Sequence, residues 1–248
     1  MLLDRSAALP KASAEYTLRD QERMRLARNY FQWQASMVEP YIGRRVLEVG
    51  CGLGNFTRYL LNRELVVGID VEPECVDSWK ASFPGATNLA GFALDVADNA
   101  FLDLKKYAPD SVVCLNVLEH IKDDGRALEH MYAVLPPGGR ALLIVPAFES
   151  LYGPIDWSLG HFRRYSKEQF RRLCESIGFR PVIRYFNMAG WLGWWLNARV
   201  FKKTEQSASQ IRLFDAVVVP LMSRLEAVAP PPFGQSLFAV LEKPAAQT

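Results

Sequence analysis

Short apolar runs alternate with amphipathic segments along the middle of the chain. In the amphipathic segments, apolar residues recur every three or four positions among charged ones, which is the spacing of one helix face. These helical segments lie near residues 55–62, 73–82, 99–107 and 123–135. The apolar runs predict strands, namely RVLEV (45–49), VVGI (66–69), LAGFAL (89–94), SVVCLNV (111–117) and RALLIV (140–145). This alternation predicts a doubly wound α/β fold, a parallel sheet with helices on both faces and right-handed crossovers.

The two ends of the chain follow other patterns. Residues 18–41 place apolar side chains at helical steps and predict one helix. Ser166 and Gln169 form a capping box that starts a later helix, and Gly178 ends it. Two more strands are predicted, at residues 179–186 and 235–243. We divide the chain into an N-terminal helical segment (1–43), an α/β core (44–186), a helical insertion before the last strand (187–234), and the last strand with the tail (235–248).

The charge balance argues against a nucleic-acid partner. The 248 residues include 29 Lys and Arg against 27 Asp and Glu, a net charge of +2. Nucleic-acid-binding proteins carry a basic face that this balance does not supply. The N-terminal sequence MLLDRSAALPK is interrupted by Asp4 and Arg5, and no apolar run reaches the roughly 20 residues of a membrane span. We therefore expect a cytoplasmic protein.

The cysteines and histidines lack the spacing of a disulfide framework or a zinc site. The cysteines lie far apart, at Cys51, Cys75, Cys114 and Cys174. This distribution predicts buried, reduced thiols. The three histidines are His120, His130 and His161, and none stands at ligand spacing from a cysteine. We expect no metal site.

Three alternating glycines separate the first predicted strand from the segment after it. Gly50, Gly52 and Gly54 follow VLEV directly. In a doubly wound sheet the first strand-to-helix turn lines the ligand crevice, and glycines let the backbone lie against a ligand with no Cβ in between. A glycine trio also serves close helix packing, so the neighbouring residues decide between the two interpretations.

Acidic residues around this turn favour a nucleoside ligand without phosphate. Asp70 ends the second predicted strand, where a carboxylate can accept hydrogen bonds from both ribose hydroxyls, and Asp95 ends the third, where it can accept one from an adenine amino group. A dinucleotide loop needs a glycine where the chain has Asn55. Glu48 precedes the loop, and we expect an anion there that repels a pyrophosphate and attracts a cationic amino-acid group. This pattern favours S-adenosylmethionine.

With these residues in place, the chain resembles the class I S-adenosylmethionine-dependent methyltransferase family. The resemblance rests on LEVGCGLGNF (47–56), GID (68–70), LDVAD (94–98), LNVLEHI (115–121) and LPPGGRALLIVPA (135–147), which cover about residues 44–148 in the family's order. It implies a Rossmann-like, mostly parallel seven-stranded sheet whose last strand is antiparallel. It also implies S-adenosylmethionine as the cofactor.

The resemblance assigns parts of the cofactor to residues. The glycines line its methionine part, Asp70 binds the ribose, Asp95 and Val96 the adenine, and Asn116 and Val117 flank the sulfonium. The full set of expected cofactor residues is Glu48, Gly50, Cys51, Gly52, Gly54, Asp70, Val71, Asp95, Val96, Asn116, Val117 and, from the leading helix, Tyr30. For Tyr30, packing on a buried helix face is an equally good interpretation.

The segment YGPIDWSLGHFRRYS (152–166) holds the candidates for the acceptor side. The expected catalytic residues are Tyr152, Asp156, His161, Arg163 and Arg164. In this interpretation His161 is a base and the arginines hold an acceptor carboxylate or phosphate. The alternative is that the arginines pair with loop acids and that His161 satisfies a backbone carbonyl. Of the other histidines, His120 could face the pocket or cap the next segment, and we expect His130 at the surface.

Tryptophans recur at helical spacing in the insertion. Trp191, Trp194 and Trp195 lead into a basic end at residues 199–203. Such a face can lie in a membrane interface, roof an apolar acceptor pocket, form a dimer contact, or pack in the core. We interpret it as a roof over a hydrophobic substrate. Peripheral membrane contact and a homo-oligomer stay open.

The leading functional hypothesis is methyl transfer, in line, from S-adenosylmethionine to a small-molecule or lipid-like acceptor. One alternative is a nicotinamide-dependent oxidoreductase on the same architecture, and another is a non-catalytic, membrane-associated adaptor. A base-modifying enzyme is disfavoured, because such enzymes usually carry a Pro-Pro-aromatic motif where this chain has NVLEH (116–120).

Overall fold

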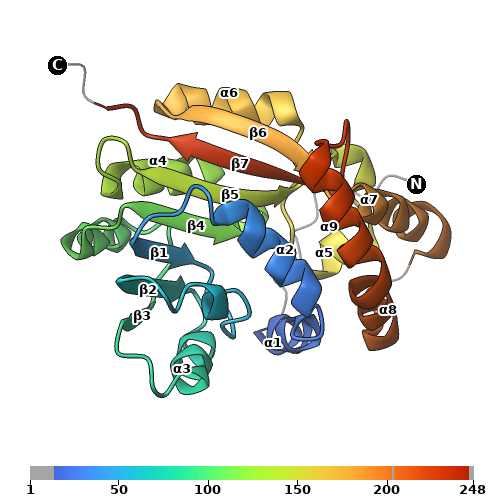
Figure 1. The fold of residues 1–248 in the computed structure, drawn as a ribbon, viewed down its shortest axis with the longest axis horizontal. Helices are drawn as coiled ribbons and strands as arrows, with labels where there is room; N and C mark the ends of the chain where they lie inside the picture. Colours follow the sequence, from blue (N-terminus) through green and yellow to red (C-terminus); the bar gives the residue numbers. More distant parts are fainter. Residues whose placement is uncertain (1–13, 203, 246–248) are drawn as a thin grey trace.

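The computed structural model describes residues 14–202 and 204–245, and these residues form a seven-stranded sheet (Figure 1). Its strand order is β3-β2-β1-β4-β5-β7-β6. The strands are β1 (Arg45–Val49), β2 (Leu65–Asp70), β3 (Leu89–Ala93), β4 (Ser111–Leu115), β5 (Arg140–Pro146), β6 (Arg180–Phe186) and β7 (Ser236–Glu242). The strands from β3 to β5 run parallel, and β7 is antiparallel to both β5 and β6. The predicted fold class is confirmed, including the antiparallel last strand.

Helices flank this sheet and gather at one end of it. The helices are α1 (Ala14–Met24), α2 (Arg28–Val38), α3 (Pro73–Ser82), α4 (Asp124–Val134), α5 (Pro154–Ser158), α6 (Lys167–Ile177), α7 (Met188–Leu196), α8 (Ala208–Leu213) and α9 (Val219–Val228). Shorter 3-10 segments are η1 (Thr57–Tyr59), η2 (Asn99–Tyr107), η3 (Leu118–His120) and η4 (Glu149–Leu151), and π-helical turns are η5 (Asn197–Phe201) and η6 (Phe214–Val218). Helices α1, α5, α7 and α8 lie at the carboxyl end of the parallel strands (Figure 1).

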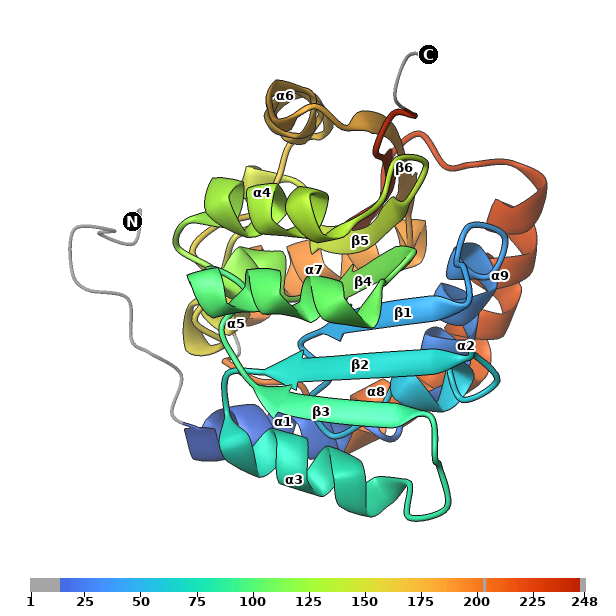
Figure 2. The ribbon, with the colours of Figure 1, turned by 90° about the vertical axis from the view of Figure 1, so that its left-hand side faces the viewer.

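The two faces of the sheet carry separate apolar clusters. On one face, strand residues such as Leu47 pack with α4, α6 and η2. On the other face, Val46 and its neighbours pack with α2, α3 and α9. Figure 2 shows α3 along β3, at the edge of the sheet. Because successive strand residues point to opposite, equally buried faces, the central strands are apolar throughout, which is why the sequence shows them as uninterrupted apolar runs.

The single helix predicted for residues 18–41 is wrong. The chain forms α1 and α2 with a break between them. The carboxylate of Asp215, far along the sequence in η6, accepts hydrogen bonds from the backbone N–H groups of Asn29 (3.1 Å) and Tyr30 (2.8 Å). These contacts satisfy N–H groups at the start of α2 that a new helix leaves without partners. The break is therefore stabilised by a residue that local periodicity does not include.

The helix predicted near residues 55–62 is wrong in length, because the structure forms only the short 3-10 turn η1 there. A buried polar chain holds this segment against the sheet: the indole N–H of Trp79 donates to Oγ1 of Thr57, which donates to Oε2 of Glu48, each over 2.7 Å. Local spacing gives no signal for such contacts, because they join α3, the loop and β1.

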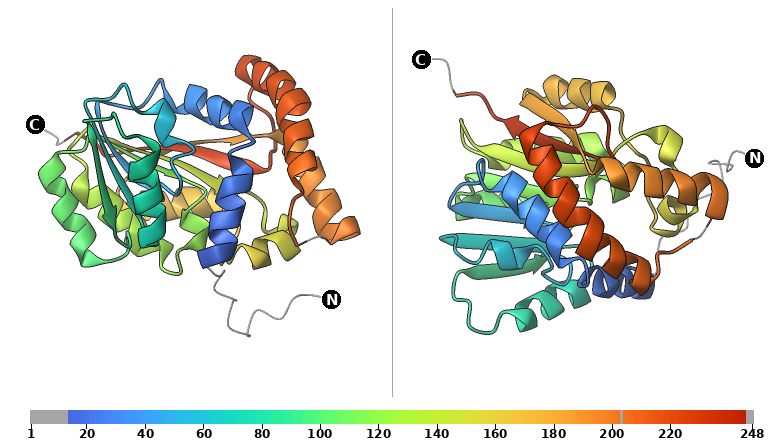
Figure 3. Two further views of the ribbon diagram at one scale, coloured as in Figure 1. Left: turned by 90° about the horizontal axis from the view of Figure 1, so that it is seen from below. Right: turned by 45° about the vertical axis from the view of Figure 1, so that its right-hand side comes forward.

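The insertion folds back over the carboxyl end of the sheet. Segments α8, η6 and α9 follow one another as one helical rod beside α2 (Figure 3). Glu226 of α9 accepts hydrogen bonds from the backbone N–H groups of Asn187 and Met188, both over 2.9 Å, and so caps the start of α7. Within the described ranges, none of the helices combines the length and apolar character needed to cross a membrane.

Candidate active site

A cavity of about 430 Å³ lies at the point where strand order reverses, between β1 and β4. Its floor is formed by residues 48–51, 113 and 115–117. One wall comes from α1 and α2, and another comes from α5 and the segment after it. The insertion closes it from above through α7 and through α8 with η6. A crevice at the switch point is the usual ligand site of a doubly wound sheet.

Six of the expected cofactor residues line this cavity. They are Tyr30, Glu48, Gly50, Cys51, Asn116 and Val117. Gly50 has φ +75°, and a Cβ there would stand 2.3 Å from Cγ2 of Val117, so only glycine fits between the loop and β4. Tyr30 stacks on Phe186 and also lines the cavity, so its ring packs as expected of a buried helix face, and its contact with the cofactor stays a prediction.

Gly52 and Gly54 lie beyond the lining. The N–H of Gly52 donates to Oδ2 of Asp70 over 3.0 Å, which joins the loop to the end of β2. A Cβ on Gly54 would stand 2.6 Å from the ring of Phe83. At Gly54 the missing side chain therefore serves close packing of the loop on the α3 side of the sheet.

The adenosine-side candidates also lie outside the lining. Asp70 ends β2, and its other carboxylate oxygen accepts from the N–H of Glu72 over 3.1 Å. Asp95 follows β3, is exposed, and accepts from the N–H of Ala97. Val71 is 59% exposed, whereas the side chain of Val96 is buried in the core. These residues are neighbours at the ends of β2 and β3, and within the described ranges the carboxylates of Asp70 and Asp95 accept hydrogen bonds from backbone amides.

Glu48 does not match its expected charge. Burial raises the pKa of its carboxyl group to about 8, and only part of this effect is offset by the hydrogen bond from Thr57. Burial therefore favours the protonated form of Glu48 at neutral pH, because a carboxylate out of water is costly even with one hydrogen bond. Burial thus opposes the negative charge expected at this position, and the role of Glu48 at the cofactor stays a prediction.

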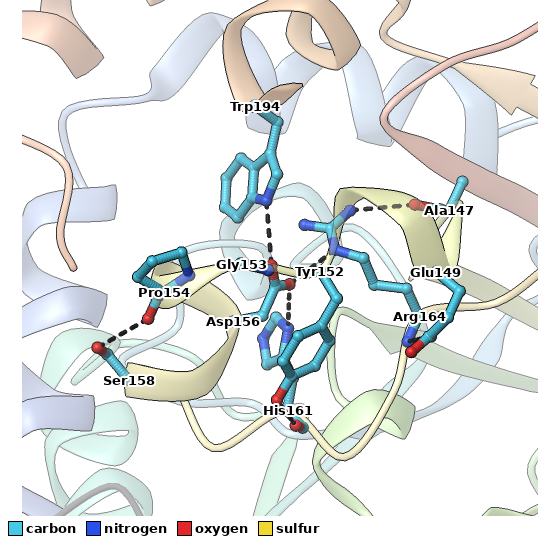
Figure 4. A network of polar contacts seen from close by, with 10 residues as sticks. All are labelled: Ala147, Glu149, Tyr152, Gly153, Pro154, Asp156, Ser158, His161, Arg164 and Trp194. Atoms are coloured by element: carbon cyan, nitrogen blue, oxygen red, sulfur yellow. Dashed lines mark hydrogen bonds and ion pairs between the residues drawn. The ribbon is translucent and has the colours of Figure 1, made fainter. Parts of the chain in front are cut away.

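Three expected catalytic residues, Asp156, His161 and Arg164, form one buried network around the Asp156 carboxylate (Figure 4). The side chain of Asp156 accepts hydrogen bonds from Nε of Arg164 (2.8 Å), Nδ1 of His161 (2.9 Å), the indole of Trp194 (3.2 Å) and the N–H of Gly153 (3.0 Å). Burial alone would raise the pKa of Asp156, but Arg164 and His161 outweigh it and lower the pKa. Asp156 is thus an ionised carboxylate, and both of its oxygens accept hydrogen bonds.

This network fixes the tautomer of His161. An ionised carboxylate can only accept, so Nδ1 of His161 carries the proton in its contact with Asp156. In the neutral ring, Nε2 then holds a lone pair, and His161 lines the cavity. Arg164 also lines the cavity, and its guanidinium stacks on the ring of Trp194 at 4.8 Å.

The remaining acceptor-side candidates point elsewhere. Arg163 pairs with Asp124 over 2.6 Å and donates to the carbonyl of Lys122, and it is absent from the lining formed by the described residues. It therefore has no route to a ligand in this cavity. The hydroxyl of Tyr152 donates to the carbonyl of His161 over 2.7 Å and supports the loop.

Two residues of the motif LNVLEHI gain importance only from the structure. Glu119 and His120 line the cavity in η3, opposite His161. Glu119, His120 and His161 each place one potential ligand atom within 4.8 Å of the others. The expectation of no metal site rested on cysteine spacing, and it overlooked the adjacent Glu-His pair.

His130 is not a surface residue. It is buried in α4, its Nδ1 lies 2.8 Å from the carbonyl oxygen of Val96, and its ring stacks on Phe101. The neighbouring face of α4 covers the sheet, so a polar ring is tolerated there through this hydrogen bond. The four cysteines are buried and free, as predicted.

Comparisons with known proteins agree with this architecture. A family model described as a methyltransferase domain matches residues 10–183. A methyltransferase of Mycobacterium tuberculosis is 35% identical over 106 residues, which are 42% of this chain and 41% of that protein. The chain spans about half or less of the length of the curated relatives it matches first.

Solved structures share the fold at low sequence identity. The methyltransferase of a complex with the Haloferax volcanii Trm112 methyltransferase activator is 17% identical, with 97% of this chain and 100% of that chain covered and a TM-score of 0.66. The plantazolicin methyltransferase BamL, solved with a desmethyl analogue and SAH, is 14% identical, covers 94% of this chain and 90% of its own, and has a TM-score of 0.55.

Proposed function

The chain belongs to the class I S-adenosylmethionine-dependent methyltransferase family, and on this premise we propose that it methylates a hydrophobic, lipid-like small molecule under the helical insertion. One observation supports this proposal most directly. A single cavity extends from the glycine turn after β1 to the helical segments α7, α8 and η6, which cover it like a roof. Membership of this family replaces the oxidoreductase and the non-catalytic adaptor as interpretations of the fold.

The charges around the cavity support a cationic cofactor. The acidic residues that line it within the described ranges are Asp20, Glu48, Glu119, Glu205 and Asp215. The guanidinium of Arg164 is already paired with Asp156, so its positive charge does not fully offset these acidic groups. A cationic ammonium or sulfonium in this cavity lowers the cost of ionising the buried carboxyl groups of Glu48 and Glu119, whereas a pyrophosphate raises it, so these acidic residues favour a cationic cofactor. S-adenosylmethionine supplies an activated methyl group, and the residues of the cavity have to align it with the acceptor.

Asp70 is the proposed ribose ligand, and its replacement tests the cofactor assignment. Asp70→Ala is expected to weaken S-adenosylmethionine binding by about 1–3 kcal/mol, roughly 5- to 150-fold, because it removes a pair of charged hydrogen bonds. Isothermal titration calorimetry measures the change. Asp77→Ala, an exposed aspartate of α3 outside the cavity lining, is the matched control and should bind as the wild type does. Unchanged affinity in Asp70→Ala would remove Asp70 from the site.

The roof side of the cavity suits an apolar acceptor. Ile155 and Leu159 line it below the roof, and Trp194, Ile211 and Phe214 line it from the insertion. His161 is the proposed residue at the reacting end, because the Nε2 lone pair can accept the proton of an acceptor hydroxyl. Incubation with labelled donor and fractionated cell extract, lipid against aqueous, tests the acceptor class. Label confined to the aqueous fraction would contradict a lipid-like acceptor.

An exposed apolar stripe along the insertion supports access from a membrane surface. Leu213, Val217, Leu221 and Leu225 recur at four-residue steps on the rod of α8, η6 and α9, and each is more than half exposed. We call these four residues the apolar stripe. A membrane interface takes up such a face, and a lipid-like acceptor would enter from it.

The charges beside the apolar stripe favour an anionic membrane. Arg212 and Arg224 are exposed on the same rod, whereas its acidic residues, Asp215 and Glu226, are buried as helix caps. The accessible charge of the rod is therefore basic, which attracts anionic lipid headgroups.

Leu221→Asp is expected to reduce binding to phosphatidylglycerol-containing vesicles at least about 10-fold, because a leucine side chain in an apolar environment contributes about 1.5–3 kcal/mol and a carboxylate repels anionic lipid. Vesicle co-sedimentation measures it. Val182→Asp on β6 is the matched control, since Val182 is 68% exposed but lies outside the stripe. Equal losses in both variants, or no wild-type binding, would contradict the membrane proposal.

A further inference from the structure

Three potential metal ligands converge on the cavity beside the end of β4. Glu119 and His120 belong to η3, and His161 comes from the loop after α5. One atom of each lies within 4.8 Å of the others, and the two imidazole rings stand at 89° with their centroids 4.6 Å apart. The three groups come from two separate segments, so the tertiary fold brings them together.

One carboxylate oxygen of Glu119 is buried without a hydrogen-bond partner in the part of the chain that the structure describes. That oxygen is Oε2, and Glu119 is 1% exposed. A buried oxygen without a partner costs about 1–3 kcal/mol, so such a group calls for an explanation in the form of a missing ligand or ion.

The imidazoles of His120 and His161 are both placed to bind a metal ion. Asp156 holds Nδ1 of His161 over 2.9 Å, which leaves Nε2 as the free ring nitrogen. A carboxylate on the far nitrogen is the usual support of a metal-bound histidine. His120 lines the same cavity, with its ring edge-to-face against that of His161.

We propose that Glu119, His120 and His161 bind one divalent first-row transition ion, such as Zn²⁺, Mn²⁺ or Fe²⁺. Two imidazole nitrogens and one carboxylate oxygen are the ligand set of open sites for these ions, in which the remaining positions stay available to water or substrate. Arg164 is paired with Asp156, so it does not supply a partner for the carboxyl group of Glu119, and a bound cation would be that partner.

The position of this ion also suggests a role, which rests on the proposed function. The open coordination positions would face the cavity that Asn116 and Val117 line. An acceptor hydroxyl bound there would have a lower pKa, as metal-bound water does. With the ion in place, Nε2 of His161 is a ligand, and an acidified hydroxyl can lose its proton to water.

Metal titration of the full chain tests the site directly. Chelator-treated protein is titrated with Zn²⁺ by isothermal calorimetry and with Mn²⁺ by following the loss of the free-ion EPR signal. One ion per chain is expected. Glu119→Gln, which keeps the shape of the side chain, should weaken the affinity at least about 10-fold, and Asp156→Asn about 10- to 100-fold through the orientation of His161. Circular dichroism checks that each variant is folded.

A second ligand variant and a control keep the outcome decisive. His120→Asn should match Glu119→Gln, while Glu129→Gln, an exposed glutamate of α4 outside the cavity lining, should bind metal as the wild type does. No stoichiometric binding, or equal affinity in both ligand variants and the control, would overturn the site. S-adenosylmethionine affinity is measured separately in the chelator-treated protein, so failure of the cofactor assignment and failure of the metal site give different results.

Discussion

Replacing Asp156 with alanine is expected to lower the free energy of unfolding at pH 7 by about 3–5 kcal/mol. The side chain is fully buried and accepts from Arg164, His161, Trp194 and Gly153. Its removal leaves the guanidinium of Arg164, itself 4% exposed, as a buried charge without its carboxylate. Breaking a buried pair from one side is much more costly than losing an exposed one, because desolvation of the remaining charge is no longer offset.

Urea denaturation measures this loss, and Asp124→Ala provides the matched control. Asp124 also pairs with Arg163 and accepts a hydrogen bond from the hydroxyl of Tyr165. The side chains of Asp124 and Arg163 are, however, 18% and 26% exposed. We expect a loss of about 1–2 kcal/mol there. Because the pKa of Asp156 is lowered below 3.8 in the folded chain, its stabilisation is present above that pH and shrinks as the pH falls further. Equal losses in the two variants would show that the network around Asp156 is no stronger than an ordinary ion pair.

Replacing Glu48 with glutamine is expected to stabilise the protein as the pH rises. The pKa of Glu48 is about 8 in the folded chain against 4.5 ordinarily. Between these values the unfolded chain ionises while the folded chain keeps its proton, so rising pH favours unfolding of the wild type. Glutamine removes this penalty. The difference in unfolding free energy between Glu48→Gln and wild type should grow in favour of the variant by about 3 kcal/mol from pH 4 to pH 7.

Urea denaturation of both proteins across this pH range checks the effect, and any constant difference between the two side chains cancels in the comparison. Glutamine can still accept the hydrogen bond from Thr57, so the buried chain to Trp79 is preserved. Glu74→Gln, an exposed residue of α3, is the control and should show no pH-dependent gain. A flat difference for Glu48→Gln would mean that its carboxyl group is ionised in the folded protein at neutral pH.

The active-site candidates divide into those given by local motifs and those given by contacts. The start of the glycine turn, Gly50 and Cys51, and the residues after β4 follow from a strand-turn pattern, and the structure places them in the cavity lining. The pairing of Arg163 with Asp124, the packing role of Gly54 and the burial of His130 all depend on partners distant along the chain. Periodicity carries no information about such partners. Glu119 was overlooked for the same reason, because its significance lies in its distance to His161.

The sequence by itself determined the doubly wound sheet, its antiparallel last strand and the family, because buried parallel strands and the turns between them have short-range signatures in hydrophobicity and glycine placement. The tertiary structure alone decided where α1 ends and α2 begins, which acids are protonated, and which arginine reaches the cavity. It also decided that Asp156, Arg164 and His161 form one network and that Glu119 and His120 stand opposite His161. These features depend on burial and on pairs of residues from separate elements, and both exist only once the chain is packed.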